Sequence, residues 1–428
     1  MYILKSYILP FLSLLPFLIP ADAVPVPDGT QIGAIHVKGQ KRYTESQIVL
    51  ASGLKVGQNF ELFALNAATQ KLGETGAFEE VTFSYKSSSG KVTVEFAVKE
   101  AAKFHRCTFD NFVWAADQEL QDHLKEEISL YDGFAPDAGN FADQIAASLG
   151  RFNRAHGVPY PVESTHFGAL GDSNWSFMFV TKGPVIKISS LQFQGVKQLD
   201  EGLLRRAAQP LLTRTYSSID SGLFAHGTFT SIYKDRGFLQ VSFAAPSSKI
   251  TKHLEGSADF EVEVAYSIAE GLAYDWQEPD WNGNQVLAAK KLTELMGLKS
   301  GQRADASKID HGWDALQNAY TSRGYMDFAI RPEPLFDDPN HSVRYKVAIS
   351  EGPQYHMGNL SIAGVPPATA DKLKDRWPMK QTDIYDASYL MKFETNVMFP
   401  VLGSHPRVIS TVRPDRNTLT VDVTLRVE

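Results

Sequence analysis

Residues that could do chemistry are scattered along this chain. The eleven histidines show no metal-ligand spacing, and the HExxH, GxSxG, GxGxxG and Walker patterns do not occur. Adjacent carboxylates occur at Glu79-Glu80, Glu126-Glu127 and Asp337-Asp338. A general acid and a general base must converge from separate elements, so adjacent carboxylates are more typical of solvated faces and turns. We therefore expect no catalytic, cofactor-binding or metal-binding residues, and no small-molecule substrate.

The composition is that of an ordinary globular protein. The chain has 428 residues, 43% of them hydrophobic and 21% charged, with a formal net charge of −7. This charge provides no basic surface for nucleic acid, so we expect no nucleic-acid partner. Cys107 is the only cysteine, which excludes an internal disulfide and favours a buried thiol.

The N-terminal segment has the pattern of a secretory signal. Lys5 precedes an apolar run over residues 7–19, and Ala21-Asp22-Ala23 supplies small residues at a cleavage point. The run is shorter than the roughly 20 residues of a membrane-spanning helix. We predict that residues 1–23 are a signal peptide and that the mature chain is exported; the alternative is an uncleaved membrane anchor.

Five glycines divide the rest of the chain at a regular interval. They recur about every 80 residues, and each closes an expected helix and leads toward an expected strand: Gly76, Gly157, Gly237, Gly324 and Gly403. A fixed period of this length is the mark of a repeat architecture. We expect each glycine to supply the left-handed turn that ends a helix.

The fourth copy shows the pattern most clearly. Gly297 ends a first helix, and a second begins near Asp305 with one apolar stripe over residues 309–320. An extended segment over residues 326–330 follows Gly324. We expect Pro332 and Pro334 to begin the turn that leads to the closing strand.

The closing strands alternate strictly between apolar and polar residues. These runs occupy residues 92–98, 175–179, 260–266, 343–349 and 419–427. A period of two predicts a strand with one buried face. Each copy therefore has the order strand, helix, helix, strand, strand, which predicts an α+β fold with a three-stranded mixed sheet covered by two helices.

The repeats set the expected domain boundaries. We predict domains at residues 31–101, 104–184, 186–271, 273–353 and 355–428. In the fourth domain, Trp276 and Trp281 replace the usual opening strand. They either pack on the helices or form an aromatic peptide-binding patch.

The junction between the fourth and fifth copies resembles a known family. Residues 347–364, VAISEGPQYHMGNLSIAG, resemble the junction between consecutive POTRA (polypeptide transport-associated) domains, and residues 32–57 resemble the start of another. The resemblance extends to the C-terminus and is nearest to BamA-like outer-membrane assembly factors. In these proteins, five such domains precede a membrane β-barrel. Because the fifth closing strand ends at Glu428, we expect only the soluble, periplasmic part of that role, in either a free-standing protein or a truncated form.

A three-stranded sheet leaves an edge strand that can accept another chain as an added strand. We expect this edge in the strand after each repeat glycine. The candidate peptide-binding residues are Val81, Phe83 and Tyr85; Leu239, Val241 and Phe243; and Met326, Phe328 and Ile330.

The resemblance and the expected edges together suggest a function. We expect a non-enzymatic periplasmic scaffold, or client-binding module, in outer-membrane protein assembly. Its partners would be unfolded outer-membrane protein clients or an outer-membrane β-barrel protein. The alternative is a structural spacer that docks to a separate membrane protein of a division or secretion complex without handling clients.

Overall fold

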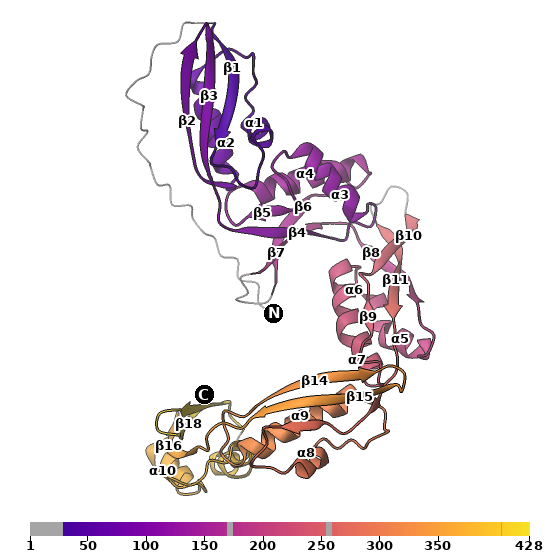
Figure 1. Cartoon of the computed structure of the whole chain (residues 1–428), viewed down its shortest axis with the longest axis vertical. Helices are drawn as coiled ribbons and strands as arrows, with labels where there is room; N and C mark the ends of the chain where they lie inside the picture. The colour runs from indigo at the N-terminus through magenta and orange to yellow at the C-terminus, as the bar shows by residue number, and fades with distance from the viewer. Residues whose placement is uncertain (1–28, 169–173, 254–258, 404) are drawn as a thin grey trace. The chain divides into compact units, whose positions relative to one another are not determined.

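A computed structural model describes residues 29–168, 174–253, 259–403 and 405–428 of the chain. The predicted signal peptide, residues 1–23, lies outside the described residues. The chain folds into five small mixed sheets, each with its own helices (Figure 1). The predicted α+β class and the repeated element order are therefore confirmed. The described residues form two compact units: one holds residues up to Val185 together with Asp259, and the other holds residues 186–253 and 260–428.

The first domain has the predicted order of elements. Its elements are β1 (Gln31–Lys38), α1 (Glu45–Ser52), α2 (Leu62–Glu74), β2 (Phe78–Ser88) and β3 (Lys91–Glu100). The closing strand β3 is central, with β1 parallel on one side and β2 antiparallel on the other. Helix α1 begins with a capping box in which Thr44 and Gln47 bond each other's backbone N–H groups.

The second domain has one strand more than predicted. Its elements are β4 (Phe104–Asp110), α3 (Asp117–Glu127), β5 (Phe134–Pro136), α4 (Phe141–Ala155), β6 (Val162–Phe167) and β7 (Ser176–Thr181). The short strand β5, between the two helices, pairs with the outer side of β4. The first and second domains share one continuous hydrophobic core.

In the third domain, the second helix is interrupted. Its elements are β8 (Ile186–Gln194), α5 (Glu201–Ala207), η1 (Gln209–Thr213), α6 (Ser218–Phe224), η2 (Ala225–Phe229), α7 (Thr230–Lys234), β9 (Ser242–Phe243), β10 (Ser247–His253) and β11 (Phe260–Ala269). A π-helical turn, η2, joins α6 to α7. Both β9 and β10 pair with the same side of β11, so the edge strand is broken in two.

The fourth domain departs from the prediction at two places. Its elements are β12 (Asp275–Trp276), β13 (Asp280–Asn282), α8 (Ala289–Leu295), α9 (Ala306–Thr321), β14 (Ala329–Asp337) and β15 (Ser342–Ser350). The opening strand is split into β12 and β13, which lie before and after Pro279. Both pair with β15. Pro332 and Pro334 do not begin a turn; they lie within β14.

Both tryptophans of the split strand belong to the core. Trp276 is fully buried, and Trp281 packs against the same cluster while its ring nitrogen donates to Thr293. An aromatic peptide-binding patch at this place would need exposed rings. The two tryptophans therefore pack in the core, but the prediction that they replace the opening strand is wrong, because β12 and β13 form that strand.

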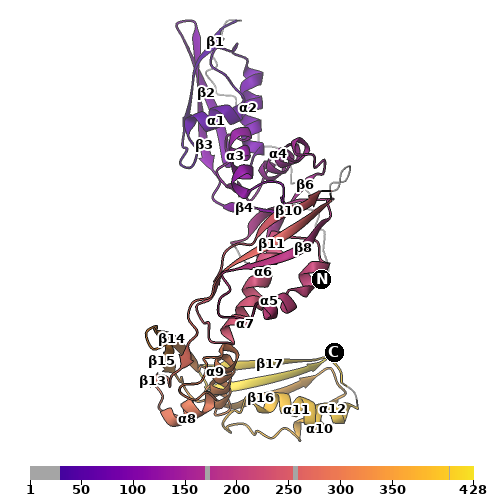
Figure 2. The same cartoon turned by 90° about the vertical axis from the view of Figure 1, so that its right-hand side faces the viewer.

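The fifth domain repeats the plan of the first. Its elements are β16 (His356–Ala363), α10 (Pro367–Lys374), α11 (Tyr389–Phe393), η3 (Glu394–Met398), α12 (Phe399–Leu402), β17 (Val408–Asp415) and β18 (Thr420–Val427). The sheet order is β16-β18-β17. The helices lie along one face of this sheet, as Figure 2 shows.

Candidate strand-binding edges

The edge formed by each opening strand is already occupied by the chain itself. In the first domain, Gly57 N–H donates to Ile32 O at 2.7 Å and Ile32 N–H donates to Gln58 O at 2.9 Å. The loop between the two helices makes the same kind of bridge in the first, third, fourth and fifth domains: Gln31 to Asn59, Lys187 to Thr215, Asp275 to Arg303 and His356 to Ile384. An incoming strand would have to displace this loop.

The strand after each repeat glycine forms the opposite edge, and β2 is the longest of them. It spans Phe78–Ser88 without a proline and lies on the outer side of the first sheet (Figure 1). Val81, Phe83 and Tyr85 all fall in β2, half-buried against the core, as predicted for an edge strand with one buried face.

Turn geometry fixes which backbone groups of β2 point outward. Ser89 and Gly90 have φ of 52° and 73° and join β2 to β3 in a two-residue turn that closes on the pair Ser88 and Lys91. The carbonyl of Ser88 therefore faces β3, and direction alternates along a strand. It follows that the N–H and C=O groups of Val81, Phe83, Tyr85 and Ser87 face away from β3.

The predicted third-domain edge begins later than the sequence indicated. Leu239 and Val241 lie in a turn, where their N–H groups donate to Gly237 O and Phe238 O. Leu239 packs against the core of the fourth domain. Only Phe243 lies in a strand, the two-residue β9. The prediction of an edge strand at Leu239 and Val241 is therefore wrong.

The predicted fourth-domain edge is wrong in the same way. Met326 and Phe328 precede β14, and their N–H groups donate to Gly324 O and Tyr325 O. Met326 packs against the fifth-domain core, and Phe328 is buried in its own domain. Ile330 is the one predicted residue within β14, where it pairs with Ile349.

Two prolines modify the edge of β14. Pro332 and Pro334 pair with Val347 and Tyr345 in an unbroken antiparallel register. A proline has no N–H for a ladder, so proline is accepted in a strand only where its nitrogen faces away from the neighbour. The outer edge of β14 therefore lacks two successive donors, and an added strand would lose two hydrogen bonds there.

The remaining edge strands are shorter or irregular. β10 carries a register shift between Ile250 and Lys252, and β17 has Pro414 near its end. Bulges and prolines are common means of protecting an edge from strand addition. β2 has a register shift of its own, between Phe78 and Glu80, but its pairing is unbroken from Glu80 to Ser88, so β2 is the most complete free edge in the described chain.

The five repeat glycines all adopt positive φ: Gly76 at 72°, Gly157 at 75°, Gly237 at 88°, Gly324 at 83° and Gly403 at 67°. Three of them also lie at joints with the following domain: Gly76 against the backbone of Ala138, and Gly237 and Gly324 through hydrogen bonds. Gly237 O accepts from Tyr274 N–H at 2.9 Å, and Gly324 O accepts from Tyr355 N–H at 2.8 Å. A Cβ on Gly324 would lie 2.5 Å from Tyr355 O. The sequence indicated the helix stop but not this contact with the following domain.

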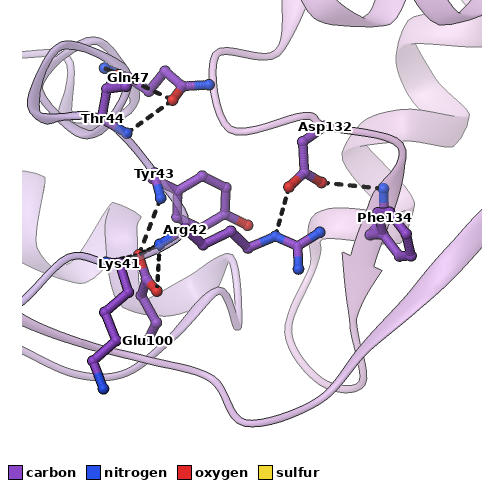
Figure 3. A network of polar contacts seen from close by, with 8 residues as sticks. All are labelled: Lys41, Arg42, Tyr43, Thr44, Gln47, Glu100, Asp132 and Phe134. Atoms are coloured by element: carbon purple, nitrogen blue, oxygen red, sulfur yellow. Dashed lines mark hydrogen bonds and ion pairs between the residues drawn. The ribbon is translucent and has the colours of Figure 1, made fainter.

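A further contact links the first and second domains (Figure 3). Arg42 Nε lies 2.6 Å from Asp132 Oδ2, and the guanidinium carbon lies 4.2 Å from the Phe104 ring centre and 4.9 Å from that of Phe134. Asp132 also accepts from the backbone N–H of Phe134. Burial alone would lower the pKa of Arg42, but the hydrogen bond to Asp132 and the charge of that carboxylate, with smaller contributions from Tyr43 and Glu100, together raise it.

A glutamate clamp recurs where a closing strand ends. We use this name for Glu100, Glu270 and Glu351, whose carboxylates accept backbone N–H groups from the segment after the opening strand. Figure 3 shows Glu100 bound to the N–H groups of Lys41, Arg42 and Tyr43 in this way. The sequence signal lies in the Glu-Gly pairs at 270–271 and 351–352, which stand at the predicted domain boundaries.

The described residues offer little for catalysis or metal binding. No group of three or more His, Cys, Asp or Glu side chains in that part of the chain is placed to hold a metal ion. Cys107 is buried as expected, and burial raises the pKa of its thiol to about 12. Within residues 29–168, 174–253, 259–403 and 405–428, every helix is too short or too polar to span a bilayer.

Comparison with known proteins points to one family. Residues 30–101 and 274–352 match the POTRA family, described as a surface antigen variable number repeat. The chain is 23% identical over 256 residues to an outer membrane protein assembly factor of Treponema pallidum, covering 58% of this chain and 30% of that protein. It is 22% identical over 262 residues to BamA of Neisseria meningitidis serogroup B, covering 56% of this chain and 31% of that protein.

Among solved structures, POTRA domains 3–5 of Haemophilus influenzae BamA match with a TM-score of 0.45 at 19% identity, covering 57% of this chain and 96% of that one. The chain spans about a third of the length of the two curated relatives, 30% and 31%.

Proposed function

Because the chain is a POTRA-domain protein related to the periplasmic region of BamA-like assembly factors, we propose that it is a non-enzymatic module that binds extended outer-membrane clients by strand addition. The observation that carries the proposal is the free edge of β2, Phe78–Ser88, which keeps its outward donors from Val81 to Ser87. Main-chain pairing accepts many sequences, which suits a binder of many unfolded clients.

The client edge is β2 rather than the third- or fourth-domain segments. Val81, Phe83 and Tyr85 present outward N–H and C=O groups, while their side chains stay anchored in the core. Pro332 and Pro334 make β14 the least suitable edge. We further propose that residues 1–23 export the chain to the periplasm, where such clients pass.

The test uses a proline that removes one outward donor. Val81→Pro deletes an N–H that does not bond β3, so the sheet of the first domain keeps its own ladder. Val81→Ala is the matched control, because it trims the same side chain and keeps the N–H. We expect photo-crosslinking of an extended porin-derived peptide to the purified chain to fall at least tenfold for Val81→Pro and to stay near the parent level for Val81→Ala.

A gain-of-function variant makes the test sharper. Replacing Pro332 and Pro334 with threonine restores two outward donors on β14 and should create a second crosslinking position in the fourth domain. If Val81→Pro stays folded by circular dichroism and captures peptide as well as Val81→Ala, β2 is not the client edge.

One set of contacts favours the spacer as a second candidate. Arg42 with Asp132, and Gly324 with Tyr355, tie consecutive domains together. Fixed joints suit a spacer that holds a set distance to a separate membrane protein. Pull-down from detergent-solubilised envelope distinguishes the two: many unfolded porin-like clients support strand capture, and one stoichiometric partner supports the spacer.

A further inference from the structure

The free edge of β2 is complementary to itself. From the register of the first sheet and its hairpin turn, we infer that two copies of this chain pair antiparallel along β2, with the two-fold axis at Phe83. Outward backbone groups lie on Val81, Phe83 and Tyr85, so an antiparallel copy can bond only where these residues meet one another. In the inferred register Phe83 faces Phe83 of the second copy, and Val81 faces Tyr85.

The charges of Glu80 and Lys86 favour this register over the registers with the axis at residue 82 or 84. With the axis at Phe83, Glu80 lies opposite Lys86 of the second copy, and the symmetry makes this pair twice. Moving the axis to residue 82 or 84 would place Glu80 opposite Ser84 or Ser88 instead. Opposite charges directly across an antiparallel pair stabilise it. Both side chains are exposed, and neither forms an ion pair among the described residues.

The residues of β3 that lie across from Glu80 and Lys86 do not form a direct ion pair with either of them. On β3, Lys99 lies across from Glu80 and its charge interacts with that carboxylate, but the direct ion pair of Lys99 Nζ is with Glu79, at 2.5 Å. Lys86 lies across from Thr93, which is uncharged. The Glu80 carboxylate and the Lys86 ammonium therefore each remain available to a second copy.

Side chains match on both faces of the paired strands. On the face toward the core, the half-buried rings of Phe83 meet each other, and Val81 meets Tyr85. Aromatic and β-branched residues are favourable cross-strand partners. On the exposed face Thr82 meets Ser84, two small polar side chains that fit directly opposite each other.

The contact is small, which sets its strength. One pair of strands buries less than the roughly 1,200 Å² of a standard stable interface, so the association belongs to the weak, concentration-dependent class. Self-pairing occupies the same edge as the proposed client, and it would therefore compete with client capture. The pairing itself does not depend on the proposed function.

Charge reversal tests the inference on the whole purified chain. Glu80→Lys and Lys86→Glu each place like charges opposite one another twice per dimer, and we expect either change to weaken dimerisation about tenfold in sedimentation equilibrium. The double variant restores both pairs in the reversed sense and should recover most of the parent affinity. Equal weakness of the single and double variants, or a parent chain that stays monomeric at the highest soluble concentration, overturns the proposal.

Cysteine crosslinking tests the register independently. Thr82 and Ser84 are exposed and face each other across the inferred axis in a non-hydrogen-bonded pair, the spacing at which a disulfide forms. Under oxidation, a mixture of Thr82→Cys and Ser84→Cys chains should give crosslinked dimers that contain one of each. Homodimers of Thr82→Cys alone would place the axis at residue 82, homodimers of Ser84→Cys alone at residue 84, and either result would refute the register. Native Cys107 is buried and does not interfere.

Failure of the two proposals can be told apart. Peptide capture is measured below the concentration at which the chain self-associates, and self-association is measured without peptide. Charge reversal at Glu80 or Lys86 should change self-association but not peptide capture, because backbone pairing with a client does not use the contact between Glu80 and Lys86.

Discussion

Removing the third-domain glutamate clamp should be among the most damaging single substitutions in the chain. Glu270 is only 5% exposed, and its carboxylate accepts the N–H groups of Lys197, Gln198 and Leu199 at 3.0, 2.9 and 3.2 Å. It also accepts the Tyr233 hydroxyl at 3.0 Å. Glu270→Ala removes the acceptor and leaves all four donors without it.

The size of the effect follows from those donors. A hydrogen bond to a charged group contributes about 1.5–3 kcal/mol, and a buried donor left unsatisfied costs about 1–3 kcal/mol. These values are not additive within one network. We therefore expect Glu270→Ala to lower the unfolding free energy of the third domain by at least about 3 kcal/mol, and Glu270→Gln, which keeps one acceptor oxygen, by about 1–2 kcal/mol.

The assay is hydrogen exchange in the third domain, because whole-chain melting of several domains is not a single two-state transition. Protection of β8 and β11 should fall in Glu270→Ala. Glu263→Ala is the matched control on the same strand, since Glu263 accepts only from the side chains of Ser190 and Gln192. Equal protection in the Glu270→Ala and Glu263→Ala variants would refute the clamp argument.

The pH dependence has a definite sign. Burial alone would raise the pKa of Glu270, but the backbone N–H groups of Gln198, Lys197 and Leu199 and the Tyr233 hydroxyl outweigh it and lower the pKa below its ordinary value of 4.5. A lowered folded-state pKa stabilises the fold above the ordinary value, and this stabilisation is lost as pH falls through the folded-state pKa. The stability gap between the parent and Glu270→Gln should therefore narrow below pH 4.5.

Two further substitutions test the joints. Gly324→Ala should lower hydrogen-exchange protection in the fourth domain by more than Gly297→Ala does. Both positions have positive φ, which costs about 1 kcal/mol, but only a Cβ at 324 would meet Tyr355 O. Equal losses of protection would argue against the joint. Arg42→Ala should weaken the contact between the first and second domains by about 1 kcal/mol or less, since the ion pair with Asp132 that it removes is partly exposed to solvent, and exchange protection at that joint is the measurement. Unchanged protection would contradict this role for Arg42.

The fold could be predicted because its signals are local. A left-handed glycine after a helix, and strict alternation in a strand, each reflect the conformational preference of a few neighbouring residues. Gly324 and the run at 343–349 show both signals, and both elements are present as expected. Asp305 likewise caps α9, where its side chain accepts from Lys308 N–H.

The misplaced strand starts have a physical cause. Apolar residues directly after a repeat glycine have the composition of a strand. Leu239 and Met326, however, pack their side chains against the core of the following domain. Their backbone N–H groups bond locally in a turn. The burial partner of such a residue lies in another repeat, so a pattern read within one repeat cannot identify it.

The prediction of a turn at Pro332 and Pro334 was wrong for a related reason. In the middle of a sheet, Pro332 and Pro334 would break the ladder, and the usual prediction is a turn. At an edge, a proline whose nitrogen faces outward costs no hydrogen bond. The sequence does not say which strand of a domain is the edge, so the same residue supports both predictions until the sheet order is known. The clamp and the joints were missed because their partners lie far apart in sequence, as Lys197 and Glu270 do.

The contrast between β14 and β2 bears on what occupies the free edge. A long exposed edge is an aggregation hazard, and proteins usually blunt it with prolines, bulges or short strands. β14 carries two prolines and β10 a register shift near its end, while the register shift of β2 lies at its start and leaves the outward donors over Val81–Ser87. A pure spacer would gain nothing by leaving one edge unprotected, so the contrast favours an occupant for β2. Proline at Val81 should exclude a client strand and a second copy alike, whereas charge reversal at Glu80 should exclude only the second copy. The two substitutions together therefore identify the occupant.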